Sequence, residues 1–154
     1  MFPIEIETHP ARRVAAVPHR GPYPEIARAF GALGAVLNGR GLTDEARGMV
    51  AIFYDDPTAV PKAELRSHAG VMVGDHVSVA DPLEEVHLPA GRHAVMHFRG
   101  PYAGLPAAYD TLYGSWLPSS GEEPADAPPF EIYHNSPMDT APEDLRTDIC
   151  LPLR

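Results

Sequence analysis

Cysteine is nearly absent from this sequence: Cys150 is the only one among 154 residues. One cysteine cannot form an internal disulfide, and it offers too few thiolates for a cysteine-based metal site. Disulfide-stapled secreted folds and zinc-ribbon folds are therefore excluded. The scarcity is typical of a reducing compartment, and we expect a cytoplasmic location.

Long apolar runs are also missing. No stretch approaches the roughly 18 consecutive apolar residues that a membrane-spanning helix needs. The first residues, MFPIEIETHPARR, lack the basic start and apolar run of a secretory signal peptide. We therefore expect no membrane association.

Basic residues are few. Lysine and arginine total 12 against 21 aspartates and glutamates, which gives a formal charge of −9. Such a surface repels phosphate backbones, so we expect no direct nucleic-acid binding. Glycine-rich phosphate-binding motifs are absent as well, and we expect no cofactor. Proteins and small cations stay open as partners.

What the sequence does contain is an internal repeat. Residues 20–23 and 99–102 both read RGPY. Downstream, AIFYDDP (51–57) aligns with FEIYHNS (130–136), which places Tyr54 on Tyr133. With a shift of one residue, ELRSHAGVMV (64–73) aligns with DLRTDICLPL (144–153). Between these landmarks the helix residues Ile26, Phe30 and Leu33 match Leu105, Tyr109 and Leu112. Four landmarks in one order predict a duplication, in a single domain whose repeats span about 1–75 and 76–154.

Each half follows the pattern βαββ. Strands are expected at 13–19 and 92–98, each followed by a Gly-Pro turn and a helix. The second helix carries Leu105, Tyr109, Leu112 and Trp116 on one face, and the first carries Ile26, Phe30, Leu33 and Leu37. Two strands complete each half, and short leading strands are expected near 4–7 and 85–88. The predicted fold is α+β: two antiparallel sheets with helices packed on one side, and a central cleft.

The two halves differ most informatively at Glu131. In the alignment above this glutamate takes the place of Ile52, and strand alternation puts it on the same face as Tyr133. One interpretation is a glutamate that faces solvent, since charged residues are rarely buried. The other is a carboxylate in an aromatic-lined cleft, where a cationic ligand would supply its partner.

The segments VAIFYDDPTAVPKAELRSHAGVMV and FEIYHNSPMDTAPEDLRTDICLPL resemble the hallmark segments of the GyrI-like small-molecule-binding family. That family includes the DNA gyrase inhibitor protein and effector-binding domains of multidrug-responsive and AraC-type regulators. The resemblance implies a cleft for bulky, often cationic, aromatic compounds, with the glutamate of the F-E-x-Y segment as the acid that meets them. Because the first strand begins almost at Met1, we expect a stand-alone member without a DNA-binding segment.

Several aromatic and histidine side chains are candidates for lining this cleft. Tyr133 and Tyr54 are favoured, Tyr102 and Tyr23 are possible, and His97 and Trp116 are weaker because both suit packed positions. A metal site is not expected, since four strand residues separate His93 from His97 by about 13 Å.

Three functions remain open. The favoured one is a binding module for lipophilic, cationic aromatic compounds, with Glu131 as the charge-matching acid. The second is an interaction protein like the gyrase inhibitor, with DNA gyrase or a regulator as its protein partner. The third is a hydrolase of cyclopropane-bearing DNA-alkylating toxins that uses Glu131 and Tyr133, so enzymatic activity stays open although binding is preferred.

Overall fold

The computed structural model describes residues 2–154 and divides into two compact units. The first unit is Ala11–Ala90, and the second combines the residues up to Pro10 with Gly91–Arg154. Each unit holds an antiparallel sheet with helical segments packed against it, which confirms the predicted α+β class.

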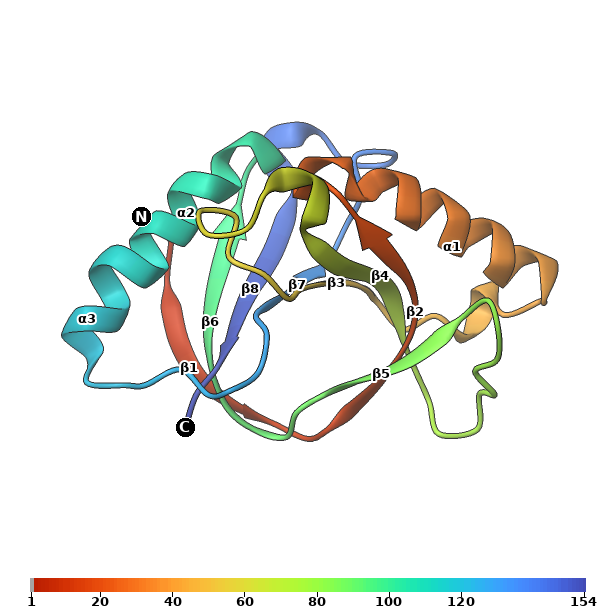
Figure 1. Cartoon of the computed structure of the whole chain (residues 1–154), viewed down its shortest axis with the longest axis horizontal. Coiled ribbons are helices and arrows are strands. Elements are labelled where there is room, and N and C mark those ends of the chain that lie inside the picture. The colour runs from red at the N-terminus through yellow and green to blue at the C-terminus, as the bar shows by residue number, and fades with distance from the viewer. Residues whose placement is uncertain (1) are drawn as a thin grey trace. The chain divides into compact units, whose positions relative to one another are not determined.

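The first unit has the strand order β3-β4-β2-β5, with every neighbour antiparallel. Its elements are β2 (Arg12–Arg20), α1 (Ala27–Gly39), β3 (Met49–Phe53), β4 (Arg66–Val73) and β5 (Glu84–Leu88). Helix α1 lies beside β2 and β4 (Figure 1) and buries Ala29, Leu33 and Leu37 against alternate residues of these strands. The spacing of four and four along the helix puts these three side chains on one face.

The second unit has the order β1-β6-β8-β7, again antiparallel throughout. Its elements are β1 (Ile4–His9), β6 (Gly91–Arg99), α2 (Leu105–Thr111), α3 (Leu117–Ser120), β7 (Phe130–Tyr133) and β8 (Arg146–Pro152). Its core joins Met96 and Ile149 of the sheet to Ala108 and Leu112 of the helical segment.

The leading strands exchange between the predicted halves. Strand β1 pairs with β6, and β5 pairs with β2, so each leading strand completes the sheet of the other half. The boundary near residue 75 therefore does not coincide with the boundary of the units, because strand pairing assigns β5 to the first unit. The duplication itself and the central cleft stay predictions.

The repeated RGPY motif forms the same turn in both units. Gly21 N donates to Leu65 O at 2.9 Å, and Gly100 N donates to Leu145 O at 2.8 Å. Both glycines have positive φ, 127° and 136°, a region that side chains with a Cβ rarely adopt. The motif is thus architectural: it turns the chain from strand to helix.

The helical segment of the second unit contains a π-helical turn. Residues 105–120 run continuously as α2, the π-helical turn Leu112–Trp116 and α3 (Figure 1). A π-helical turn inserts one residue into an α-helix. Left-handed glycines follow the two helical segments at Gly41 and Gly121, a separation of 121 − 41 = 80, whereas the RGPY motifs are 99 − 20 = 79 residues apart.

This extra residue corrects the sequence alignment of β7. In the first unit Ala51 pairs with Ala69, and in the second Glu131 pairs with Ile149, the residue 80 positions after Ala69. Glu131 therefore corresponds to Ala51 and not to Ile52.

The same shift separates two tyrosines that the sequence alignment placed together. The Tyr54 hydroxyl contacts His68 Nδ1 at 2.7 Å, and 80 residues later His134 Nε2 contacts Asp148 at 2.8 Å. Tyr54 thus corresponds to His134, and Tyr133 to Phe53. The predicted pairing of Tyr54 with Tyr133 is wrong because the inserted residue lies between the anchors of the alignment.

Among residues 2–154, none of the helices has both the length and the apolar character that crossing a membrane requires.

Candidate functional site

Glu131 is a buried carboxylate on β7. Its side chain is 4% exposed, and its register partner Ile149 belongs to the core of the second unit. Cross-strand partners point to the same face, so Glu131 lies on the face that carries the helical segment. Glu131 and Tyr133 share a face, as strand alternation predicts. The interpretation of a solvent-facing glutamate is wrong, because the residue is buried.

Two tyrosine hydroxyls satisfy this carboxylate. Tyr109 of α2 donates to Glu131 Oε2 at 2.6 Å, and Tyr133 of β7 donates to Oε1 at 2.6 Å. Distances this short are typical of hydrogen bonds to an ionised acceptor. Each oxygen of the buried acid therefore has its own neutral donor.

Burial dominates the electrostatics of this group. It raises the pKa of Glu131 above the usual carboxyl value, although the hydrogen bonds from Tyr109 and Tyr133 pull that pKa back down. Burial, with the nearby Glu131 charge second, raises the pKa of both tyrosines well above their usual value. The tyrosines thus remain donors across the physiological pH range.

No basic side chain pairs with Glu131 within the described residues 2–154. Its hydrogen-bond partners are two neutral hydroxyls, so an ionised Glu131 has no opposite charge beside it among these residues.

Further aromatic rings surround the three-residue group. The Tyr102 ring meets Tyr133 edge-on with centroids 5.8 Å apart, and Tyr113 stacks on Tyr109 at 6.2 Å. Tyr102 is 36% exposed, and its hydroxyl makes no hydrogen bond to the part of the chain that the structure describes. Tyr102 therefore offers an aromatic face and a free hydroxyl to solvent.

Trp116 ends the π-helical turn. Its ring is half-buried and packs against the core of the second unit. This placement agrees with the packed role that its helical spacing predicts.

Tyr23 and Tyr54 lie in the first unit. The Tyr23 hydroxyl lies 3.0 Å from the carbonyls of Asp55 and Arg66, and the Asp55 amide donates to it at the same distance. This hydroxyl anchors the chain after β3. Tyr54 instead contacts His68. Both residues lie on the face of the sheet opposite α1, as the register of β3 against β4 shows.

His97 lies on the other face of its sheet. It pairs with Asp148 across β6 and β8, whereas Glu131 shares its face with Ile149, the next residue along β8. Burial lowers the pKa of His97, but Asp148 and Glu7 outweigh burial and raise it above the usual value. The structure thus separates His97 from the group around Glu131.

Tyr109 is the site residue that the sequence analysis missed. Its helical spacing marked it as a core residue, in the position of Phe30 in the first half. The signal was present: a hydroxyl appears on the helix where the first half has phenylalanine, and a carboxylate appears on β7 where it has alanine. Only the corrected register brings the two changes together.

A surface hollow of about 210 Å³ also lies in the second unit. Its lining is apolar or small, apart from the hydroxyl of one threonine. The lining residues are Phe2, Met96, Gly104, Ala107, Ala108 and Thr111. It contains neither Glu131 nor its tyrosines, and we assign it no role.

One curated relative supports the resemblance seen in the sequence. The DNA gyrase inhibitor of Yersinia enterocolitica is 29% identical over 135 residues, which cover 84% of this chain and 84% of the relative.

Three solved structures share the fold. The C-terminal domain of EcmrR superposes with a TM-score of 0.79 at 16% identity, covering 100% of this chain and 98% of that domain. A Listeria innocua protein described as a hydrolase gives 0.69 at 15% identity, with 98% and 91% coverage. SAV2435, solved with bound tetraphenylphosphonium, gives 0.66 at 12% identity, with 99% and 94% coverage.

A family model agrees over almost the whole length. The GyrI-like small-molecule-binding domain matches residues 2–154. The chain therefore belongs to the GyrI-like small-molecule-binding family.

Proposed function

We propose that this protein binds bulky, lipophilic aromatic cations, with Glu131 as the group that matches the positive charge. One observation carries the proposal: a buried carboxylate is held by two neutral tyrosine hydroxyls, with no basic side chain paired to it in the described chain. A bound cation would supply the missing charge.

The surrounding rings would add to this attraction. A cation near the face of an aromatic ring gains about 0.5–2 kcal/mol. Tyr102 is the ring best placed to meet a ligand from solvent, because it is exposed and touches Tyr133. Tyr133 and Tyr109 would adjust their hydroxyls as the ligand approaches Glu131.

The second unit carries most of the proposed contacts. Glu131, Tyr133 and Tyr102 are the central ligand-binding residues, and Tyr109 joins them as an addition to the sequence prediction. Trp116 and Tyr23 have packing or anchoring roles that account for their positions. For Tyr54 and His97, ligand contact stays a prediction without structural support.

SAV2435, which shares this fold, supplies a probe for the proposed ligand class. That protein is described as bound to tetraphenylphosphonium, an aromatic cation. At 12% identity the likeness shows the fold alone, so the argument for this chain rests on Glu131 and its tyrosines.

Calorimetric titration with two ions of the same shape tests the proposal. Tetraphenylphosphonium and tetraphenylborate differ in charge, and triphenylphosphine oxide is a neutral aromatic reference. We expect the phosphonium to bind, and Glu131→Gln to weaken it about tenfold or more, which is about 1.4 kcal/mol. Glu84→Gln, an exposed glutamate of the first unit, is the matched control and should bind as the wild type does.

The opposite result would be equally clear. If borate and phosphonium bind alike, or if Glu131→Gln leaves the affinity unchanged, then the charge-matching role of Glu131 is wrong.

A second candidate function is inhibition of DNA gyrase through a protein contact. The curated relative carries that name, and a chain of charge −9 complements a basic DNA-binding surface. A supercoiling assay with purified gyrase tests it: inhibition by the wild type and by Glu131→Gln alike would favour this function over ligand capture.

The hydrolase alternative uses the same residues. Glu131 would take a proton from water as the water oxygen bonds to a cyclopropane carbon. The ring C–C bond would break toward the substrate carbonyl, and Tyr133 would donate its proton to the resulting enolate oxygen and regain one from Glu131, 2.6 Å away. A neighbour described as a hydrolase keeps this alternative open. Consumption of a cyclopropane-bearing compound by the wild type, lost in Tyr133→Phe, would favour turnover over binding.

A further inference from the structure

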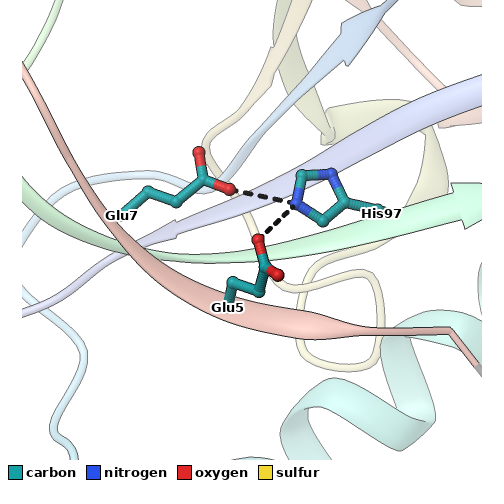
Figure 2. Close-up of side chains that lie close together, drawn as sticks. All are labelled: Glu5, Glu7 and His97. Carbon is teal, nitrogen blue, oxygen red and sulfur yellow. Dashed lines mark hydrogen bonds and ion pairs between the residues drawn. The ribbon is translucent and has the colours of Figure 1, made fainter.

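We propose a transition-metal site, of the kind that takes Zn²⁺, formed by Glu5, Glu7 and His97 on the face of the second unit's sheet opposite Glu131. Figure 2 shows the two carboxylates of β1 meeting the imidazole of β6. The site is independent of the proposed ligand function.

Strand geometry brings these side chains together. Glu5 and Glu7 alternate with Ile4 and Ile6 along β1, so both glutamates point to the same face. In the register of β1 against β6 they lie across from Val95 and His93, on the face of His97.

The distances suit a shared ion. His97 Nε2 lies 3.0 Å from Glu7 Oε2 and 3.3 Å from Glu5 Oε2, and the three potential ligand atoms lie within 4.8 Å of one another. In a tetrahedral zinc site with bonds of about 2.0–2.1 Å, neighbouring ligand atoms are about 3.3–3.4 Å apart. Small side-chain movements would therefore place all three around one ion.

The far side of the imidazole supports the same role. His97 Nδ1 lies 2.8 Å from Asp148 Oδ1, and the second oxygen of Asp148 lies 2.8 Å from His134 Nε2. Asp148 is only 17% exposed, so it holds the ring firmly. A carboxylate that accepts the second N–H of a histidine is the usual support of a metal-binding imidazole.

This support has a consequence for Nε2. When Nδ1 donates its hydrogen to Asp148, the neutral ring directs a lone pair from Nε2 toward Glu5 and Glu7. Nε2 is then a ligand atom that lies beside the oxygens of Glu5 and Glu7. A divalent ion bound here would take the place of a proton on Nε2 and use all three groups as ligands.

The carboxylates of this cluster have no permanently charged partner in residues 2–154. Glu5, Glu7 and Asp148 form ion pairs only with histidines, and none with a lysine or arginine of residues 2–154. Glu7 Oε1 contacts His9 Nε2 at 2.9 Å, and this contact holds the carboxylate while its other oxygen faces His97. Glu5 is mostly exposed, which leaves a path for the ion and room for a water as fourth ligand.

The ligand types indicate the class of metal. One imidazole with two carboxylates suits Zn²⁺, Co²⁺ or Ni²⁺, whereas Mg²⁺ and Ca²⁺ prefer oxygen ligands throughout.

The first unit offers an internal comparison. Glu84 pairs with Ala16 across β5 and β2 as Glu5 pairs with Val95, 79 residues after Ala16. The residues there that correspond to His97 and Glu7 are Pro18 and Val86. Glu84 contacts His68 at 2.7 Å but has no third ligand of this set. The first unit therefore lacks the site, and Glu84→Gln is a matched control.

The experiment is a calorimetric titration of the metal-stripped, tag-free protein with Zn²⁺, repeated with Mg²⁺. We expect one tight Zn²⁺ per chain, no comparable Mg²⁺ binding, and tetrahedral Co²⁺ absorption bands. His97→Ala and Glu5→Gln should abolish or strongly weaken binding, Asp148→Asn should weaken it about 10–100-fold, and Glu84→Gln should leave it unchanged.

Circular dichroism of each variant separates lost ligands from lost folding. Glu5 is exposed, so Glu5→Gln tests the site even if His97→Ala fails to fold. The proposal is overturned if no stoichiometric Zn²⁺ binds, if binding survives in Glu5→Gln and His97→Ala, or if Glu84→Gln weakens it equally. The last two results would assign the metal to scattered surface histidines.

Discussion

At the scale of single residues, the surroundings of Glu131 disfavour its ionised form. In place of solvating water, the carboxylate has two tyrosine hydroxyls, each 2.6 Å from one of its oxygens. Hydrogen bonds to a charged group contribute about 1.5–3 kcal/mol each, while the desolvation of a carboxylate costs several kcal/mol. The cost of desolvation exceeds the gain from the two hydrogen bonds, so the pKa of Glu131 is raised.

This imbalance predicts a pH-dependent stability. Because the folded-state pKa of Glu131 lies above the unfolded value, its contribution is fully present below the unfolded pKa and is lost as pH rises through the folded pKa. Relative to Glu131→Gln, the wild type should lose free energy of unfolding across that window, by at most about 1.4 kcal/mol per pH unit. Urea unfolding of both proteins at a series of pH values measures the difference.

Tyr109→Phe extends this test. Removing one donor takes away an interaction that lowers the pKa of Glu131, so the window should reach to higher pH. A difference between wild type and Glu131→Gln that stays constant with pH would contradict the raised pKa.

At the scale of elements, Gly70 in β4 and Gly34 in α1 differ in the space that a Cβ atom would have. A Cβ built on Gly70 in β4 would lie 2.4 Å from Val14 Cγ1 and 3.0 Å from the carbonyl of Ala15, both in the neighbouring strand. A Cβ on Gly34 in α1 would meet nothing within 4 Å. One glycine is needed for close packing, and the other leaves the helix without a side chain.

We therefore expect two alanine substitutions to act in opposite directions. Gly70→Ala should lower the free energy of unfolding by about 1–3 kcal/mol, because Val14 is fully buried and has little room to move. Gly34→Ala should raise it by about 0.8–1.0 kcal/mol, since alanine favours helix. Thermal and urea unfolding of both variants measures the two changes. A Gly70→Ala variant as stable as the wild type would show that β4 tolerates the extra methyl group.

At the scale of the whole molecule, the charge of −9 acts on approaching ligands. A negative surface raises the local concentration of cations, and salt screens this attraction. The effect adds to the local contacts of Glu131, and it acts on the rate of association more than on the bound state.

The expected result is a salt-dependent association rate. Raising the ionic strength from about 0.01 M to about 0.1 M shortens the screening length from about 30 to about 10 Å, so tetraphenylphosphonium should associate more slowly. Stopped-flow tyrosine fluorescence measures the rate, with neutral triphenylphosphine oxide as the control. If both compounds slow equally, the net charge plays no part in capture.

The sequence by itself determined the local elements of this protein. The RGPY motif predicted the two strand-to-helix turns, because glycine tolerates unusual dihedral angles and proline presets φ for the start of a helix, and both glycines do have positive φ. Apolar spacing predicted α1 and the helical segment of the second unit. Alternation predicted that Glu131 and Tyr133 share a face. These features depend on neighbours in the chain, so local patterns are enough to find them.

Only the tertiary structure decided which distant residues meet. The helical segment with the π-helical turn is one residue longer than the alignment assumes, so strand pairing matches Glu131 to Ala51 and not to Ile52, and no local pattern marks the place of the extra residue. The hydrogen bond of Tyr109 to Glu131 depends on how α2 packs against β7. The meeting of Glu5 and Glu7 with His97 depends on β1 joining the sheet of the other half. Strand pairing and helix packing are set by the burial of the whole core, which is why these contacts could not be read from the spacing of residues along the chain.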